Sequence, residues 1–155
     1  MALILDDRGV RVSCPQCRTT NRVAFSRLAE RARCASCKAD LPVITEPIEV
    51  ASVAQFDALI SQSAVAVLVD FWAPWCGPCR AVAPEVEKVA YSLRGQLVAA
   101  KVNTDVLPEL GERYGIRSIP TLTVFRGGRE AARVSGALAA ADIVKLAEPA
   151  LAAKA

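Results

Sequence analysis

The chain has 155 residues, of which 53% are hydrophobic and 23% charged, a composition typical of a globular protein with one core of about 100 residues and a smaller attachment. It contains no histidine, which excludes Cys-His and Ser-His-Asp catalytic sites as well as metal sites with histidine ligands. The net charge is +3, and the whole excess lies in residues 1–46, where eight basic side chains accompany five acidic ones. Four thiolates bound to a zinc ion in this segment would make the net charge less positive. The charge therefore gives little support for a nucleic-acid or membrane partner.

The first residues and the apolar runs bear on the cellular location. The opening apolar run stops at Asp6 and Asp7, and is too short and too acidic for the core of a secretory signal. The longest later run, residues 64–69, has the length of a strand and not of a membrane span. We therefore expect a cytoplasmic protein without membrane association, in a compartment where paired cysteines indicate metal or redox chemistry more often than structural disulfides.

Residues 1–46 are predicted to form a small first domain. Short strand-like runs lie at residues 10–13, 21–25 and 41–44, separated by two Cys-x-x-Cys pairs. Such a short segment cannot bury a large core by itself. Pro42 and Pro47 bracket the connection to the second domain, which we place at residues 47–155.

The two pairs have the spacing of a zinc site. Sixteen residues separate "CPQC" from "CASC", which gives C-x2-C-x16-C-x2-C. Each pair places two sulfurs on one tight turn, and two turns complete a tetrahedron around Zn²⁺, whose binding supplies folding energy that the small domain lacks. The predicted ligands are Cys14, Cys17, Cys34 and Cys37.

The residues of this domain are open to other interpretations. The four cysteines would alternatively form two disulfides or remain unrelated thiols. Zinc ribbons often bind nucleic acid, but Phe25 is the single aromatic residue in this segment, so a platform for stacking bases is missing. The seven arginines of the segment are better explained as a solvated face or as contacts to a protein partner.

Residues 47–155 alternate between helix and strand patterns. The expected elements are a helix at 55–62, a strand at 64–71, a helix at 76–93, a strand at 97–103, a helix around 107–114, strands at 121–125 and 129–135 joined by a Gly-Gly turn, and a helix at about 138–151. This order predicts an α/β domain with a central mixed sheet covered by helices on both faces.

The third pair, in "WCGPC", calls for a different chemistry. Four cysteines already satisfy one metal site, so Cys76 and Cys79 stand alone at the predicted start of a helix. Free backbone N–H groups and the helix dipole lower the pKa of the first sulfur there, which predicts Cys76 as the nucleophile. Cys79, one turn later, is placed to attack a mixed disulfide formed at Cys76. A structural disulfide or an inert pair is the alternative.

Asp70 and Lys101 are the candidate proton-handling groups. Asp70 ends the apolar run "AVAVLVD" behind the cysteine turn, where burial would raise its pKa. It would then deprotonate Cys79 directly or through a water molecule. Lys101, on the predicted neighbouring strand, would tune Asp70. The alternatives are an aspartate that caps a turn and a lysine that points to solvent.

Several stretches resemble the thioredoxin family: "VDFWAPWCGPCR", "KVNTD", "YGIRSIPTL", the Gly127-Gly128 hairpin and "VSGAL". The resemblance extends from about residue 48 to 151, and with the four-cysteine extension in front the chain is similar to bacterial second thioredoxins. It implies the thioredoxin fold, preceded by a zinc-ribbon-like domain. Cys76 matches the attacking cysteine, Cys79 the resolving one, Asp70 the buried acid and Lys101 its partner.

The resemblance also implies a binding surface and partners. Pro120 matches the family's cis-proline, which leaves the Ile119 backbone free for an extended substrate. Trp75, Ile119 and Gly136 match the flat surface around the cysteines, and Trp72 a buried tryptophan. The implied activity is protein-disulfide reduction by a monomer, with disulfide-containing targets and an NADPH-dependent thioredoxin reductase as partners. No bound organic cofactor is expected, since the chain has no dinucleotide fingerprint. Nucleic acid is not expected as a partner, because the first domain lacks a stacking platform.

The zinc site would be structural or would sense oxidants by releasing its metal. A rival interpretation makes the whole chain an adaptor, in which the zinc domain recruits a protein or a nucleic acid.

Overall fold

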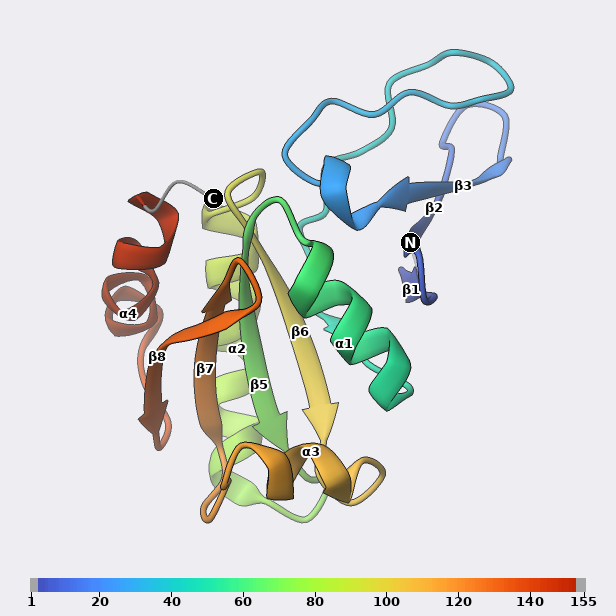
Figure 1. Cartoon of the computed structure of the whole chain (residues 1–155). Coiled ribbons are helices and arrows are strands. Elements are labelled where there is room, and N and C mark those ends of the chain that lie inside the picture. The colour runs from blue at the N-terminus through green and yellow to red at the C-terminus, as the bar shows by residue number, and fades with distance from the viewer. Residues whose placement is uncertain (1–2, 153–155) are drawn as a thin grey trace.

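The computed structural model describes residues 3–152. They form a small three-stranded antiparallel sheet followed by a five-stranded mixed sheet with helices on both faces (Figure 1). This is the fold class expected from the sequence. Within the described residues, no helix has both the length and the apolar character needed to cross a membrane.

The small sheet contains three strands in the order β1-β2-β3. Strands β2 (Gly9–Ser13) and β3 (Thr20–Ala24) correspond to two predicted strands, while β1 (Ile4–Leu5) was not predicted. A single 3-10 turn, η1 (Phe25–Arg27), follows β3. The strand predicted at residues 41–44 is wrong: this stretch has no regular structure, because Pro42 lacks the N–H group that a paired strand would need.

The large sheet has the order β4-β6-β5-β7-β8. Its strands are β4 (Ile48–Glu49), β5 (Ala66–Trp72), β6 (Leu97–Asn103), β7 (Thr121–Arg126) and β8 (Arg129–Ser135). Strands β4, β6 and β5 run parallel, whereas β7 and β8 are antiparallel to their neighbours. The sheet is therefore mixed, with the hairpin β7-β8 at one edge and the short β4 at the other.

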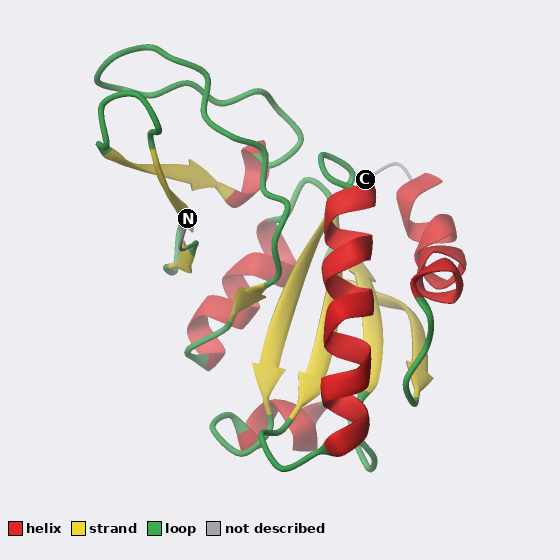
Figure 2. Ribbon diagram, turned by 180° about the vertical axis from the view of Figure 1, so that it is seen from behind, coloured by secondary structure: helices red, strands yellow, loops and turns green. Residues whose placement is uncertain are grey.

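Helices cover the two faces of this sheet in pairs. Helices α1 (Val53–Gln62) and α3 (Pro108–Arg113) pack on one face, and α2 (Gly77–Ser92) and α4 (Ala140–Ala152) on the other. Figure 2 shows α2 lying along the sheet when the molecule is seen from behind. Helix α2, for example, buries an apolar stripe that includes Val82, Val86 and Val89.

The alternation of side chains along β5 places a carboxylate inside the protein. Val67, Val69 and Phe71 join the core beneath α1, and Leu68 joins the core beneath α2. Because side chains alternate along a strand, Asp70 lies on the same face as Leu68, toward α2. Lys101 shares that face, since it is paired in register with Asp70 on the neighbouring β6.

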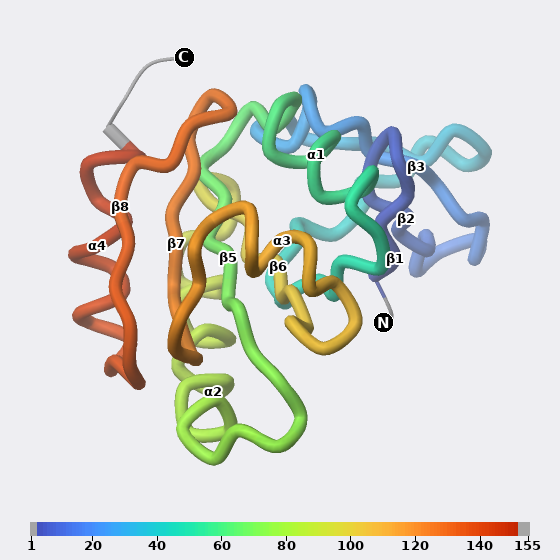
Figure 3. The backbone as a smooth tube through the Cα atoms, turned by 60° about the horizontal axis from the view of Figure 1, so that its bottom comes forward, coloured from blue at the N-terminus to red at the C-terminus, as the bar shows by residue number. Residues whose placement is uncertain are grey.

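The small domain packs against the large one beside α1. Leu5, Val10, Val12 and Phe25 belong to the same buried cluster as the inward face of α1. The N–H group of Ala64 also donates to the carbonyl oxygen of Phe25 at 3.1 Å. Figure 3 shows the small domain next to α1, with α4 on the far side of the sheet. The domain boundary at residue 46 stays a prediction. The buried core contains residues from both sides of this boundary.

Candidate functional site

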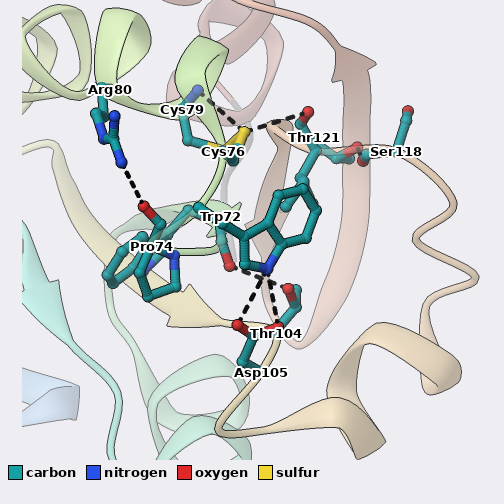
Figure 4. Close-up of a disulfide and its surroundings, with 11 residues drawn as sticks. Trp72, Pro74, Cys76, Cys79, Arg80, Thr104, Asp105, Ser118 and Thr121 are labelled. Atoms are coloured by element: carbon teal, nitrogen blue, oxygen red, sulfur yellow. Dashed lines mark hydrogen bonds between the residues drawn. A yellow bond between two sulfur atoms is a disulfide. The ribbon is translucent and has the colours of Figure 1, made fainter.

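Cys76 and Cys79 lie at the first turn of α2 and form a disulfide (Figure 4). Cys76 is the N-cap residue of the helix, and Pro78 falls within its first turn, where its missing N–H group costs little. The Sγ atom of Cys76 accepts a hydrogen bond from the backbone N–H of Cys79 at 3.2 Å. In the reduced protein, this donor and the positive end of the helix dipole would favour a thiolate at Cys76.

A second segment meets the disulfide from the start of β7. The peptide bond between Ile119 and Pro120 is cis, and the carbonyl oxygen of Ile119 lies 3.6 Å from Sγ of Cys76. The N–H group of Gly136 donates to the carbonyl oxygen of Pro120 at 2.8 Å. The structure thus brings Cys76, Ile119, Pro120 and Gly136 together from three separate parts of the chain.

Trp75 forms an exposed apolar surface next to the cysteines. Its side chain is 68% exposed, and its indole N–H donates to Asp105 at 3.1 Å, which holds the ring in place. A shallow groove of about 370 Å³ runs from Trp75 past Gly115 to Ile119. Asp105 was not predicted as a site residue, because its contact to Trp75 spans 30 positions in the sequence.

Asp70 is buried behind the cysteine turn. It is 1% exposed, and neither carboxylate oxygen has a hydrogen-bond partner. Burial raises the pKa of Asp70 from 3.8 to about 6, although the positive charge of Lys101 acts in the opposite direction and the negative charge of Glu49 adds to the rise. A carboxyl group with this pKa exchanges protons near neutral pH.

A cavity of about 380 Å³ opens next to Asp70. Lys101 and Glu87 line it together with residues 45–47, which connect the two domains. The ammonium group of Lys101 lies 4.6 Å from the centre of the Trp72 ring, an attractive cation–π arrangement. Trp72 itself is only half-buried, contrary to the expectation of a buried tryptophan.

The four other cysteines form one cluster in the small domain. Their Sγ atoms all lie within 4.8 Å of one another, with Cys14 and Cys37 at 3.6 Å and Cys17 and Cys34 also at 3.6 Å. Zn–S bonds of about 2.3 Å in a tetrahedron place sulfurs about 3.8 Å apart, so this arrangement fits a zinc ion. None of the four forms a disulfide.

The two cysteine turns repeat the same geometry. The N–H groups of Arg18 and Lys38 donate to the carbonyl oxygens of Cys14 and Cys34, at 2.9 Å and 3.0 Å. Both residues have positive φ angles, 64° for Arg18 and 67° for Lys38, in the left-handed conformation that closes each turn. The repeat explains why two distant Cys-x-x-Cys segments present their sulfurs to a common centre.

Asn21 of β3 holds the second of these turns. Its amide N–H donates to Sγ of Cys34 at 3.4 Å, and its Oδ1 accepts from the N–H of Ala35 at 3.0 Å. Hydrogen bonds from the backbone of Cys37 and from Asn21 lower the pKa of Cys34 to about 6, which favours the thiolate needed for metal binding. Nothing in the sequence around Asn21 predicts this role.

Comparison with protein families gives two matches. The thioredoxin family model matches residues 47–148, and a model described as "Thioredoxin 2, N-terminal" matches residues 13–39. A chloroplastic M-type thioredoxin of Chlamydomonas reinhardtii is 41% identical, over 89% of this chain and 93% of its own length. Thioredoxin C-3 of Corynebacterium nephridii is also 41% identical, over 82% of this chain and 86% of its own.

Solved structures give the same result for the large domain. A mutant thioredoxin of Halobacterium salinarum has 31% identity and a TM-score of 0.66, covering 74% of this chain and 98% of that chain. A thioredoxin of Plasmodium falciparum has 37% identity and a TM-score of 0.60, covering 65% of this chain and 96% of that one.

Proposed function

The chain belongs to the thioredoxin family, and on this premise we propose how its residues share the reduction of disulfide bonds in other proteins. The protein is a thiol-disulfide oxidoreductase with a CXXC site at Cys76 and Cys79 and an N-terminal zinc-ribbon site. The observation that carries the division of roles is the position of Cys76 at the N-cap of α2, with Cys79 one turn further along.

Cys76 is the attacking residue in this proposal. Its thiolate attacks one sulfur of a target disulfide, an S–S bond forms between Cys76 and the target, and the other target sulfur leaves and takes a proton. Cys79 then attacks Sγ of Cys76 as a thiolate, releases the second target sulfur and closes the Cys76–Cys79 disulfide. Two electrons and two protons pass to the target. The N–H donor at 3.2 Å supports the assignment of Cys76.

Asp70 accepts the proton that Cys79 must lose. Its pKa of about 6 supports this role, because a carboxylate with this pKa is a stronger base than an ordinary aspartate and is still largely ionised at pH 7. Lys101 lowers the pKa of Asp70 and so limits the rise that burial causes. It therefore acts as a positioning and tuning residue.

The target binds as an extended segment across Trp75, Ile119, Pro120 and Gly136. The exposure of the Trp75 ring and the closeness of Ile119 to Sγ of Cys76 support this surface. A target backbone that pairs with Ile119 would present its disulfide to Cys76. The groove beside Trp75 would receive the residues next to the target cysteine.

We propose Zn²⁺ as the ion held by Cys14, Cys17, Cys34 and Cys37, in a structural role. When bound, zinc would link the two turns, and its binding energy would become folding energy of the small domain. The four-sulfur geometry supports this ion. No step of the disulfide exchange involves it.

The wider setting follows from the chemistry of the reaction. A reductase partner that draws electrons from NADPH would return Cys76 and Cys79 to dithiols, and this chain itself would bind no organic cofactor. Cysteines 14, 17, 34 and 37 are unbridged, which suits the cytoplasm as a reducing compartment. The site residues named here all come from one chain, so the proposed reaction needs no second copy of the protein. Nucleic acid is not a partner in this proposal.

The test is the reduction of insulin disulfides driven by NADPH and a thioredoxin reductase, followed by turbidity. Cys76→Ser is expected to abolish turnover, whereas Cys79→Ser should accumulate a mixed disulfide with the target, visible on a non-reducing gel. Cys14→Ser serves as the control in the other cysteine cluster and should keep the exchange chemistry. Turnover that survives in Cys76→Ser would overturn the mechanism.

Redox sensing by the zinc site gives a different result in a peroxide titration. A structural site predicts that zinc release lowers the stability of the protein without a specific loss of reductase activity at a temperature where the protein stays folded. A sensor predicts that activity falls in proportion to released zinc. Measuring both quantities in the same samples separates the two roles.

A further inference from the structure

The outer edge of β3 is unpaired. In the small sheet β3 pairs with β2 on one side, and no strand among residues 3–152 pairs with its other side. The long connection after η1 arches past β3 and returns to the large domain (Figure 1). An unpaired strand edge offers a row of backbone N–H and C=O groups to any extended chain that lies beside it.

A groove of about 780 Å³ lies along this edge. All five residues of β3 and residues 30–35 line it. Val23, Ala32 and Leu41 supply an apolar lining. The volume is sufficient for several residues of an extended peptide, and the groove is distinct from the one beside Trp75.

The groove is bordered by basic side chains. Arg22, Arg27, Arg31, Arg33 and Lys38 line it, against a single carboxylate, Glu30. The side chains of Arg27, Arg31 and Arg33 are 63%, 78% and 70% exposed.

These arginines are held only by weak ion pairs. Arg27 contacts Glu30 at 3.3 Å, while Arg31 and Arg33 share Asp40 at 3.8 Å and 3.7 Å. Exposed pairs of this kind contribute little to stability, so a partner's carboxylates would replace them at small cost.

We propose that this groove binds an extended acidic segment of a partner protein, which pairs with the free edge of β3 and places carboxylates against Arg27, Arg31 and Arg33. Backbone pairing supplies a large part of the affinity in such strand addition, and side-chain charge selects the partner. Successive side chains alternate in an extended chain. A sequence with carboxylates at every second position therefore directs all of them to one side.

A nucleic acid fits the groove less well. Phe25, the single aromatic residue of residues 1–46, is fully buried in the core, so no ring is available for stacking on bases. The unpaired edge of a strand, by contrast, matches the spacing of peptide groups. The proposal adds a recruitment site to the reductase and does not depend on the chemistry of Cys76.

The experiment measures the fluorescence anisotropy of a labelled (Glu-Val)4 peptide with the full-length, zinc-loaded protein. Binding that weakens as salt rises is expected. The double charge reversal Arg31→Glu/Arg33→Glu should weaken binding at least about tenfold, because it replaces two attractions by two repulsions. The matched control Arg126→Glu/Arg129→Glu changes two arginines of the β7–β8 hairpin that do not line the groove, and should bind as the wild type does.

Two further probes separate strand pairing from charge alone. A (Glu-Val)4 peptide with N-methyl groups on every second residue keeps its charges but loses backbone donors, and should bind at least about tenfold more weakly. A (Lys-Val)4 peptide should not bind. Equal binding of the methylated or the lysine peptide would overturn the proposal. So would a single-stranded oligonucleotide that displaces the acidic peptide and depends equally on Arg31 and Arg33, since it would make nucleic acid the ligand.

Discussion

Glu49 and Asp70 occupy the same register position of the large sheet, on the two sides of Lys101. Lys101 of β6 is paired with Glu49 on β4 and with Asp70 on β5. Ile48 packs on the α1 side of the sheet, so the next residue, Glu49, faces α2. Leu68 packs on the α2 side, and Asp70, two residues later, shares that face. Lys101 is paired with both, so all three charged side chains lie on the face toward α2. One ammonium group therefore stands between two carboxylates, one of them buried and the other open to solvent.

This arrangement predicts the effect of Glu49→Gln on the pH dependence of disulfide exchange. The negative charge of Glu49 raises the pKa of Asp70, so its removal should lower that pKa. Two strand spacings place the groups about 10 Å apart, for which a shift of about 0.3 to 1 pH unit is expected, depending on the local dielectric. The acid limb of the rate profile should move to lower pH by this amount.

The control for this variant is Glu87→Gln. Glu87 lines the same cavity from α2, as Glu46 does from the connection between the domains, but Glu49 is the carboxylate whose charge raises the pKa of Asp70. The profile of Glu87→Gln should therefore match the wild type. If Glu49→Gln also leaves the profile and the ¹³C titration of the Asp70 carboxyl unchanged, the coupling across Lys101 does not exist.

Asp70→Asn should make the protein more stable at neutral pH. The pKa of Asp70 is about 6 in the folded protein and 3.8 as the ordinary value, so the folded state holds a proton that the unfolded state has lost between these two pH values. The contribution of Asp70 to the free energy of unfolding is therefore fully present below about pH 4. It is lost as pH rises through about 6. The loss amounts to about 3 kcal/mol at pH 7.

The measurement is the free energy of unfolding in urea for the wild type and Asp70→Asn at several pH values from 4 to 8. Asparagine mimics the protonated carboxyl, so the two proteins should be similar at pH 4 and diverge until about pH 6. Asp105→Asn, at an exposed aspartate, is the control. If the free energies of unfolding of Asp70→Asn and the wild type differ by the same amount at every pH, the pKa of Asp70 is not raised by folding.

Phe25→Ala should destabilise both domains together. Phe25 is fully buried and belongs to the same cluster as Phe56 and Leu59 of α1. Truncating a buried phenylalanine costs about 3–5 kcal/mol. Because the core is continuous, the fluorescence of Trp72 and Trp75 in the large domain should report the loss in a single urea transition.

Ile4→Ala is the control for this prediction. Ile4 lies in the same small sheet but is 59% exposed, so its truncation should change the free energy of unfolding by less than about 1 kcal/mol. Two separate transitions in Phe25→Ala, with the tryptophan signal unaffected, would show that the domains fold independently.

The sequence predicted local features better than contacts between distant segments. The apolar runs of β6 and the turn after β7 were long or distinctive enough to define their elements, and residues 97–103 and 129–135 were predicted with the bounds that the structure has. The strands Ile4–Leu5 and Ile48–Glu49 were missed, because two residues carry no measurable alternation. The apolar residues 41–44 have the pattern of a strand and were predicted as one, although Pro42 prevents pairing.

The same limit explains which site residues were found. Cys76 and Cys79, and the two cysteine pairs of the small domain, show their chemistry in local spacing. Asp105 and Asn21 have their contacts 30 and 13 positions away, respectively, and Glu49 depends on the register of three strands. Sequence periodicity contains no information on such pairings.

Asn21 connects the zinc cluster to the sheet, and its removal should weaken metal binding without affecting disulfide exchange. Asn21→Ala loses the donor to Sγ of Cys34 and leaves the N–H group of Ala35 without its acceptor. Partners of this kind orient metal ligands, and their loss typically lowers metal affinity about 10- to 100-fold. Competition with a chromophoric zinc chelator measures this change. Ser36→Ala, in the same cysteine turn, keeps its backbone and should retain the wild-type affinity. Equal affinities for Asn21→Ala and the wild type would show that the two turns hold the four sulfurs without help from β3.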